Sequence, residues 1–148
     1  MPFAAAPPVK SPPNVSQEHN MNFIDPHAEL ASTTLLVANT DDVTQLAQAL
    51  QNVSAVALNF PKWTDGRAYS QARLLRSRLR FEGDIVATGE VLVDMLPLLQ
   101  RSGFSVVQMR ADQDRVAAER ALGYFPGHYQ ADLASKLPAF ARPVAELA

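Results

Sequence analysis

Hydrophobic and polar residues follow a repeated order from Thr33 onward, in which a short apolar run precedes a stretch with helical periodicity. The apolar runs predict strands with the sequences TTLLVAN, VSAVALNF, DIVATG and SVVQMRA, at residues 33–39, 53–60, 84–89 and 105–111. The amphipathic stretches predict helices over 42–51, 66–79, 91–102 and 112–122, and Gly103 and Gly123 are placed to end the last two. Strands that alternate with helices are typical of parallel strands joined by crossovers, so the predicted fold class is α/β.

The two faces of the predicted sheet differ in polarity, because alternate residues of a strand point to opposite faces. One face is apolar throughout and suits a cover of helices; it comprises Leu36, Ala38, Val56, Leu58, Phe60, Ile85, Ala87, Val107 and Met109. The other face, which we call the inner face, becomes polar toward the carboxyl end of each strand. It comprises Val37, Asn39, Ala57, Asn59, Val86, Thr88, Gln108 and Arg110. This asymmetry favours four sequential βα units with helices on one face, like half of a (β/α)8 barrel, over a small doubly wound sheet. The inner face then needs a cover, either a second subunit or the N-terminal arm, and we expect a homodimer.

The chain length of 148 residues corresponds to about one domain. Residues 1–31 are rich in proline, alanine and polar side chains and predict a flexible N-terminal arm. The α/β domain is expected over 32–130 and a C-terminal tail over 131–148. A segment near Phe23 and Ile24 is apolar enough to dock on the domain or on a partner chain.

Composition excludes several classes of function. The net charge of -2 and the pI near 5.9 give no basic field that would hold nucleic acid or an anionic membrane. The absence of cysteine excludes thiolate metal sites and a cysteine nucleophile. No signal peptide or membrane span is evident, so we expect a cytoplasmic protein. Because no phosphate-binding glycine motif is present and His19, His27 and His128 lie outside the repeated units, no cofactor or metal site is evident.

A ligand of a parallel α/β fold is expected outside the carboxyl ends of the strands. We call the region at these strand ends the rim; the polar residues predicted to lie there are Asn39, Asn59, Lys62, Asp65, Arg67, Thr88, Glu90 and Arg110. In the stretch NFPKWTDGRAYS the chain turns into a helix whose first free N–H groups belong to Gly66 and its neighbours. Lys62 and Arg67 beside that helix start predict a site for a small oxyanion, closed by Arg110. The alternative is that Asp65 or Thr64 simply caps the helix with its own side-chain oxygen.

Two other groups of side chains are candidates for function. Tyr69 and Arg73 begin a flank of the predicted helix 66–79 that contains two further arginines, and we expect this pair to contact a partner rather than only solvent. Glu90 and Asp94 are one turn apart at the start of the next predicted helix. They are either an acid–base pair or a helix start that the helix dipole stabilises.

The stretch ALNFPKWTDGRAYSQARLLRSRLRFEGDIVATGEVLVDMLPLLQRSGFSVVQMR resembles a bacterial family of unknown function whose members are commonly labelled as oxidoreductases involved in sulfite reduction. The resemblance covers roughly residues 54–110 and is carried by the patterns F-P-K-F-T-D-G-R-x-Y-S-x-A-R-L-L-R, G-D-V-L-x-D-Q-L and G-F-D-x-F-x-L-R. The matching positions are Phe60, Pro61, Lys62, Thr64, Asp65, Gly66, Arg67, Tyr69, Ser70, Ala72, Arg73, Leu74, Leu75, Arg76, Asp94, Gly103, Phe104 and Arg110. The chain departs from the patterns at Trp63, Glu90, Met95 and Ser105.

The resemblance implies a role in sulfate assimilation, beside the sulfite reductase machinery. Two hypotheses follow. In the first, the protein is an accessory of sulfite reduction that binds a small oxyanion or an acidic segment of a partner at the rim. In the second, it is an oxidoreductase that uses a cofactor supplied by a partner, because the chain contains no evident redox group of its own.

Overall fold

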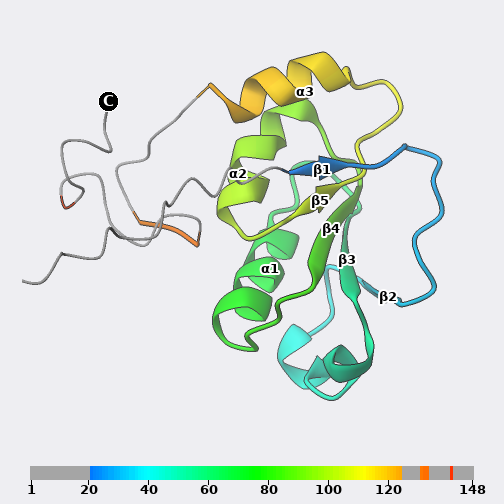
Figure 1. Ribbon diagram of the computed structural model, residues 1–148, viewed down its shortest axis with the longest axis vertical. Helices are drawn as coiled ribbons and strands as arrows, with labels where there is room; N and C mark the ends of the chain where they lie inside the picture. The colour runs from blue at the N-terminus through cyan, green and yellow to red at the C-terminus, as the bar shows by residue number, and fades with distance from the viewer. Residues whose placement is uncertain (1–20, 125–130, 134–140, 142–148) are drawn as a thin grey trace, which may run out of the picture.

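The computed structural model describes residues 21–124, 131–133 and 141, which form a parallel five-stranded sheet with helices between the strands (Figure 1). In chain order the elements are β1 (Asn22–Phe23), β2 (Thr34–Val37), η1 (Val43–Leu46), η2 (Ala49–Asn52), β3 (Ala55–Phe60), α1 (Arg67–Ser77), β4 (Asp84–Gly89), η3 (Val93–Met95), α2 (Leu96–Arg101), β5 (Val106–Val107) and α3 (Arg115–Leu122). The strand order is β1-β5-β4-β3-β2, and all neighbours are parallel. The predicted α/β class is confirmed.

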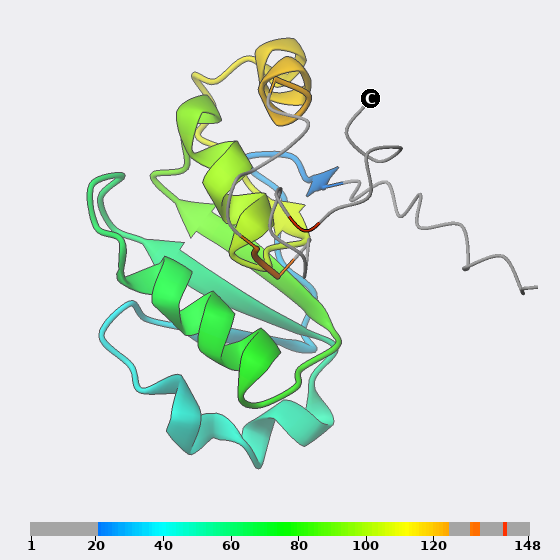
Figure 2. The same ribbon diagram turned by 90° about the vertical axis from the view of Figure 1, so that its left-hand side faces the viewer.

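The four predicted strands are neighbours in their sequential order, β2 to β5, and α1 and α2 both lie on one face of the sheet (Figure 2). This is the layout expected for successive βα units of a half barrel. A doubly wound sheet would have helices on both faces. None of the helices in the part of the chain that the structure describes is long and apolar enough to cross a lipid bilayer.

The main core lies between the sheet and its helices. Its fully buried side chains include Leu58 and Phe60 of β3, Ile85 of β4, Leu75 of α1 and Leu99 of α2. Burial of each large apolar side chain stabilises the fold by about 1.5–3 kcal/mol. The apolar stripe of the predicted helix 66–79 faces this core, which explains why α1 forms where the 3.6-residue period placed it.

The ends of α2 show how local sequence sets the helix boundaries. Pro97 lies in the first turn, where its missing N–H costs nothing. Gly103 follows the helix with a φ of 101°. The N–H groups of Gly103 and Phe104 donate to the carbonyls of Gln100 and Leu99 at 3.2 and 3.1 Å. This pattern of two bonds is a Schellman motif, so the role predicted for Gly103 is confirmed.

The helix predicted over 42–51 is wrong, because the structure has two short 3-10 helices, η1 and η2, in its place. Val43 is the buried residue of η1, and η2 has none. The apolar positions that predicted the helix, Val43, Leu46 and Leu50, still pack on the main core, but from two short 3-10 turns.

The predicted facing of β2 is also wrong. Leu36 pairs with Ala57 and Val37 pairs with Leu58, so Leu36 faces the inner side and Val37 faces the helices. Accordingly Val37 is buried, whereas Leu36 is 71% exposed. Three successive apolar residues, Leu35 to Val37, fit either facing, and only the register with β3 decides between them.

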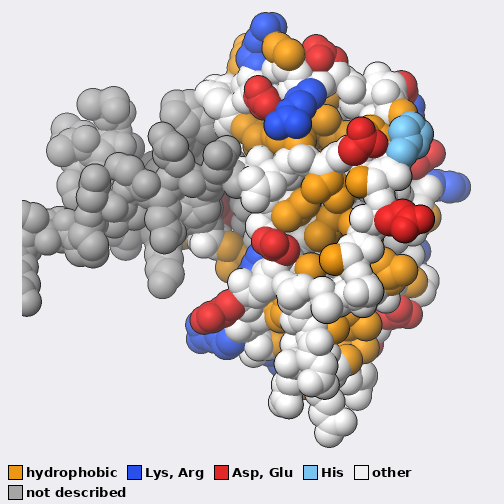
Figure 3. Space-filling view, turned by 45° about the vertical axis from the view of Figure 1, so that its right-hand side comes forward, with side chains coloured by type: hydrophobic (Ala, Val, Ile, Leu, Met, Phe, Trp, Pro, Cys, Tyr) orange, Lys and Arg blue, Asp and Glu red, His pale blue; other side chains and the backbone are white. Residues whose placement is uncertain are grey.

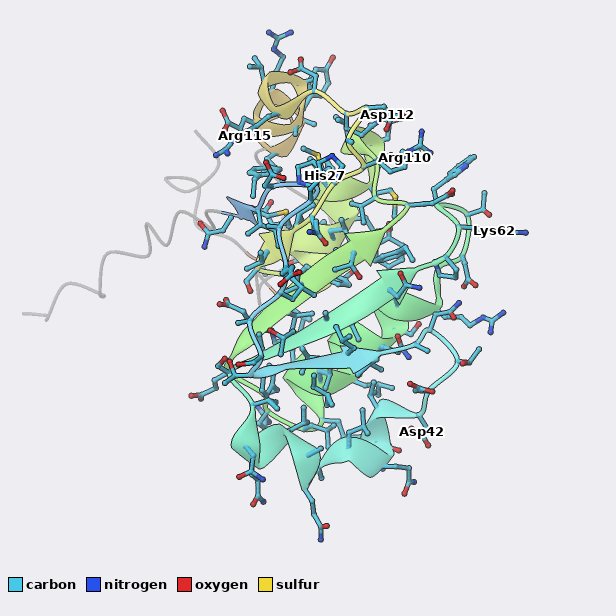
Figure 4. All side chains as sticks on the ribbon, turned by 90° about the vertical axis from the view of Figure 1, so that its right-hand side faces the viewer. His27, Asp42, Lys62, Arg110, Asp112 and Arg115 are labelled. Atoms are coloured by element: carbon cyan, nitrogen blue, oxygen red, sulfur yellow. The ribbon has the colours of Figure 1, made fainter. Side chains whose placement is uncertain are left out.

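The inner face is partly covered by residues 24–33, which we call the strap. The strap connects β1 at one edge of the sheet to β2 at the other and crosses the face opposite the helices (Figure 4). Its Ile24 and Leu30 pack against a small cluster of Ala57, Val86 and Val106. Hydrophobic side chains form a band on this side of the molecule, with acidic side chains around it (Figure 3).

The strap tests two expectations from the sequence: that the segment near Phe23 and Ile24 can dock, and that the inner face needs a cover. The segment at Phe23 and Ile24 does dock on the domain, and residues 21–31 of the predicted arm thereby take part in the sheet and its cover. A second subunit is no longer required to cover the inner face, so the homodimer stays a prediction without that argument. The first twenty residues and most of the predicted C-terminal tail lie outside the described residues.

Candidate functional site

The loop between β3 and α1, residues 61–66, carries the most distinctive motif of the sequence. A turn closes the loop, in which the Asp65 N–H donates to the Lys62 carbonyl at 3.0 Å. Trp63 lies in this turn with 56% of its surface exposed. Lys62 is exposed and projects outward beyond the carboxyl ends of the strands (Figure 4). The loop therefore presents an ammonium group and an indole ring to solvent.

Asp65 fixes this loop to its neighbours. Its Oδ1 accepts from the Arg67 N–H at 3.2 Å, and its Oδ2 accepts from Asn39 Nδ2 at 2.6 Å. Gly66 occupies the N-cap position of α1. The Asp65 side chain is 20% exposed and that of Arg67 63%, with Arg67 Nε 3.4 Å from Oδ1. Asp65 is therefore not the N-cap residue, but from the position before it accepts the first N–H of α1 and places a carboxylate where the oxyanion was expected.

Gln71 positions the loop that carries Asn39. Its Nε2 donates to the carbonyls of Ala38 and Asp41 at 2.8 and 2.9 Å. Asp41 in turn accepts from the Ala38 N–H at 2.9 Å. The Gln71 side chain is buried, and its Oε1 has no partner in the described part of the chain. A chain of hydrogen bonds therefore runs from α1 through residues 38–41 to Asn39 and Asp65.

The predicted pairing of Glu90 and Asp94 on one helix is wrong. Gly89 has a φ of 93°, and the Glu90 N–H donates to the Phe60 carbonyl at 2.8 Å. Leu92 is extended, and only then does η3 begin. Glu90 is therefore half-buried in the loop after β4, while Asp94 is exposed in the first turn of η3. The one-turn spacing does not apply because the backbone is not helical between them.

Arg110 is held by an acidic neighbour. Its Nε donates to Asp112 Oδ1 at 2.9 Å, and its Nη2 donates to the other carboxylate oxygen. The hydrogen bond from Arg110 lowers the pKa of Asp112 to about 2, and the same bond raises the pKa of Arg110. Lys62 points away from Arg110 in Figure 4. Lys62 and Arg110, two of the three cations that were expected around an oxyanion, therefore do not converge.

The other rim residues lie at the strand ends as expected. Asn59 and Thr88 are register partners on the inner face, and Thr88 Oγ1 donates to the Leu58 carbonyl at 3.3 Å. In residues 21–124, 131–133 and 141, no three His, Asp or Glu side chains lie together as potential metal ligands.

The two residues predicted to contact a partner differ in their surroundings. The Tyr69 ring packs against Phe60, with ring centres 5.1 Å apart, and lies 6.4 Å from that of Phe104. Burial raises the pKa of the Tyr69 hydroxyl. Arg73 is exposed on α1. Contact with a partner stays a prediction for both, with Arg73 the more accessible of the two.

Sequence reasoning missed three partners in this region. The contact between Asn39 and Asp65 joins residues from different βα units, and no local pattern reveals it. Gln71 looked like an ordinary polar helix residue, although its place between Ala68 and Ala72 on the buried side was a signal. Asp112 could have been found, since a carboxylate two residues after Arg110 is within reach of the guanidinium.

Comparison with known proteins places the chain in a family. No curated protein and no solved structure matches it. A family described as bacterial protein of unknown function matches residues 34–140, from the start of β2 to beyond α3. The match covers more than half of the sequence, so the chain belongs to this bacterial family of unknown function, DUF934.

Proposed function

We propose that the protein is a non-catalytic accessory of sulfite reduction whose β3–α1 loop binds an acidic segment of a partner protein in that machinery. The observation that carries this proposal is the exposure of Trp63 between Lys62 and Arg67 on a loop that Asp65 holds in place. Tryptophan and arginine are the residues most enriched among those that dominate binding energy at protein interfaces. The link to sulfite reduction rests on the resemblance of the motif FPKWTDGRAYSQARLLR.

A partner protein fits the loop better than a small oxyanion does. The first N–H of α1 already donates to Asp65, and the Arg110 guanidinium already donates to Asp112. Both carboxylates would repel a small anion bound at these donors. An acidic segment that reaches the outward-pointing Lys62 avoids this repulsion, and an apolar residue beside it can cover the Trp63 ring.

Growth experiments test the proposal in the cell. A strain that lacks the gene should grow on sulfide but poorly on sulfate or sulfite as the sole sulfur source. The wild-type chain should restore growth, and Trp63→Ala should not. Arg120→Ala, which removes an exposed arginine from α3, is the matched control and should restore growth fully. Normal growth of the deletion strain on sulfite would refute the role in sulfite reduction.

Binding experiments test the site itself. Immobilised wild-type protein should retain purified sulfite reductase, and Trp63→Ala should weaken binding at least about 30-fold, as expected for a dominant interface residue. Removal of both Lys62 and Arg67 should weaken binding and abolish its dependence on salt. Equal retention by wild type and Trp63→Ala would show that the loop is not the binding site.

Two further measurements separate the competing functions. Trp63 is the only tryptophan of the chain, so its fluorescence reports directly on the loop. A saturable change with millimolar sulfite or sulfate that disappears in Lys62→Ala would favour the small oxyanion over the partner segment. Copurification of a chromophore, seen in the absorbance spectrum and intact mass of the protein, would favour the oxidoreductase.

A further inference from the structure

Strand β2 forms an open edge of the sheet. It is the last strand in the order β1-β5-β4-β3-β2, and no strand of the described residues lies beyond it. Its Leu36 is in register with Ala57, so the Leu36 side chain faces the inner side, where the residue is 71% exposed. Proteins usually protect an open edge with lysine or proline, and residues 34–37 contain neither. The edge is therefore a template for a further strand.

The main chain of Leu36 faces this open edge. The Thr33 carbonyl accepts from the Ser54 N–H at 3.2 Å, immediately before β3, so the main chain of Thr33 faces β3. The N–H and C=O groups of successive residues in a strand point alternately to its two sides. Leu35 and Val37 therefore also face β3, whereas the N–H and carbonyl of Leu36 point away from it.

The N–H groups on either side of Leu36 are already bound at this edge. The Thr34 N–H donates to the Ala31 carbonyl at 2.9 Å, and the Ala38 N–H donates to Asp41 Oδ2 at 2.9 Å. None of the described residues outside the sheet binds the main chain of Leu36. The short helices η1 and η2 follow β2, but they pack on the main core, on the opposite side of the sheet. The N–H and carbonyl of Leu36 can therefore bind the main chain of an added strand.

The surface around β2 is acidic. Residues 21–61 contain four acidic side chains and no lysine or arginine. Asp25 and Glu29 lie in the strap before β2, Asp41 and Asp42 follow β2, and all four are exposed. Figure 3 shows acidic side chains around the hydrophobic band on this side of the molecule. An occupant with positive charge at both ends would complement this surface.

We propose that β2 binds an extended segment of a partner protein that has apolar residues at alternate positions and lysine or arginine at both ends. The segment adds a strand to the sheet: its main chain bonds to Leu36, its apolar residues cover the Leu36 side chain, and its cations face the acidic residues before and after β2. A second copy of the chain fits less well, because it would bring the same acidic surface against itself. The binding groups are separate from those of the β3–α1 loop, so the inference does not rest on the proposed function.

Three labelled peptides test the chemistry of the occupant. The first alternates valine and threonine and has two lysines at each end; fluorescence anisotropy should show that it binds the full chain saturably and more weakly as salt is added. The second has two glutamates at each end instead and should bind at least about tenfold more weakly. The third keeps the lysines but is N-methylated at its valines and threonines. It should also bind at least about tenfold more weakly, because it lacks the N–H groups that an added strand donates.

Substitutions in the protein locate the binding surface. Leu36→Lys should weaken binding of the lysine peptide at least about tenfold, because it removes the apolar contact and adds a like charge. Leu98→Lys is the matched control, since Leu98 is a 48% exposed leucine on α2, away from the sheet edge, and it should bind the peptide nearly as wild type does. Both side chains are exposed, so circular dichroism should show that both variants fold.

Amide hydrogen exchange reports on the edge directly. With saturating lysine peptide, exchange of the Leu36 N–H should slow at least about fivefold, whereas that of the Ala38 N–H, which already donates to Asp41, should change less. Equal binding by Leu36→Lys and Leu98→Lys would overturn the proposal, and so would binding that leaves exchange at Leu36 unchanged. Failure of the lysine peptide to bind would also overturn it. A wild-type dimer in sedimentation equilibrium that Leu36→Lys dissociates would then identify a second copy as the occupant.

Discussion

Replacement of Arg76 by methionine should lower the free energy of unfolding by about 3 kcal/mol, although the residue lies on the same helix as the exposed arginines. Its Nε donates to the Gly103 carbonyl at 2.9 Å, and its Nη1 donates to the carbonyls of Phe81 and Gly83 at 2.8 and 2.7 Å. These bonds tie α1 to the turn before β4 and to the end of α2. Burial lowers the pKa of Arg76, which indicates that the guanidinium has lost part of its hydration.

The magnitude follows from three opposing effects. Each hydrogen bond from a charged donor contributes about 1.5–3 kcal/mol, so three bonds give an upper bound of roughly 4.5–9 kcal/mol. The wild-type side chain offsets part of this through the cost of desolvating its charge. All three carbonyls belong to partly exposed residues and can recover water when the guanidinium is removed. Methionine keeps the apolar part of the side chain in place, which leaves a net loss of about 3 kcal/mol.

Arg73→Met is the matched control because Arg73 lies in the same helix, is exposed, and makes no side-chain hydrogen bond to another described residue. The two substitutions change helix propensity equally, so their difference isolates the three hydrogen bonds. We expect Arg73→Met to change stability by less than about 0.5 kcal/mol. Arg76→Lys, which keeps the charge but not the fork of donors, should lose most of what Arg76→Met loses.

Urea unfolding followed by far-ultraviolet circular dichroism measures these differences, since the exposed Trp63 is a poor reporter of core unfolding. For a chain of this size, 3 kcal/mol should correspond to a fall in Tm of roughly 6–12 °C. Equal stabilities of Arg76→Met and Arg73→Met would refute the reasoning. That result would mean that water replaces the guanidinium at all three carbonyls without loss.

Two further predictions concern the rim. Gly89→Ala should lower the free energy of unfolding by more than about 2 kcal/mol, because Gly89 has a φ of 93° and a Cβ there would overlap the Phe60 carbonyl oxygen. Thermal melts measure this loss. Gly66→Ala is the control and should melt near wild type, since its Cβ would lie 3.7 Å from the Tyr69 ring. Arg110→Gln should raise the pKa of Asp112 from about 2 toward 3.8, measured by NMR titration of the carboxyl carbon. The sign follows from linkage: the depressed pKa means that the pair stabilises the fold above pH 3.8 and loses this contribution as the pH falls through about 2. An unchanged Asp112 titration in Arg110→Gln would contradict the hydrogen bond as the cause.

The hydrophobic periodicity and the glycine positions of the sequence predicted those parts of the fold that depend on interactions between residues close in sequence. The 3.6-residue stripe of α1 and the glycine after α2 depend on helix geometry alone, and both are where the sequence placed them. The alternation of strands with helices left the strand order open, and the difference in polarity between the two sheet faces favoured the sequential order that β2 to β5 have. The two-residue β1 carries no period that could be recognised, and it exists only because β5 offers an edge to pair with.

The parts that could not be predicted depend on contacts distant in sequence. The facing of β2 depends on its register with β3, and a run of three apolar residues fits both choices. The candidate site shows the same limit. The motif located the rim loop and placed Asp65 beside the start of α1, but the hydrogen bond from Asn39, which fixes that carboxylate, comes from another βα unit. The charge pattern assigned Arg110 to close an oxyanion site, whereas Asp112 holds its guanidinium.

Two glutamines explain why the rim can keep its shape while its side chains face solvent. Gln71 Nε2 binds the carbonyls of residues 38 and 41, and Gln108 Nε2 binds those of residues 25 and 28. Each amide therefore closes a turn at the carboxyl end of an edge or near-edge strand through main-chain atoms alone. Because these hydrogen bonds go only to main-chain carbonyls, they do not restrict which side chains the turn carries. The β3–α1 loop is held separately, through the Asp65 carboxylate that accepts from Asn39 and from the Arg67 N–H. The side chains of Lys62 and Trp63 are therefore not needed to hold the loop, and their exposure is better explained by recognition than by folding.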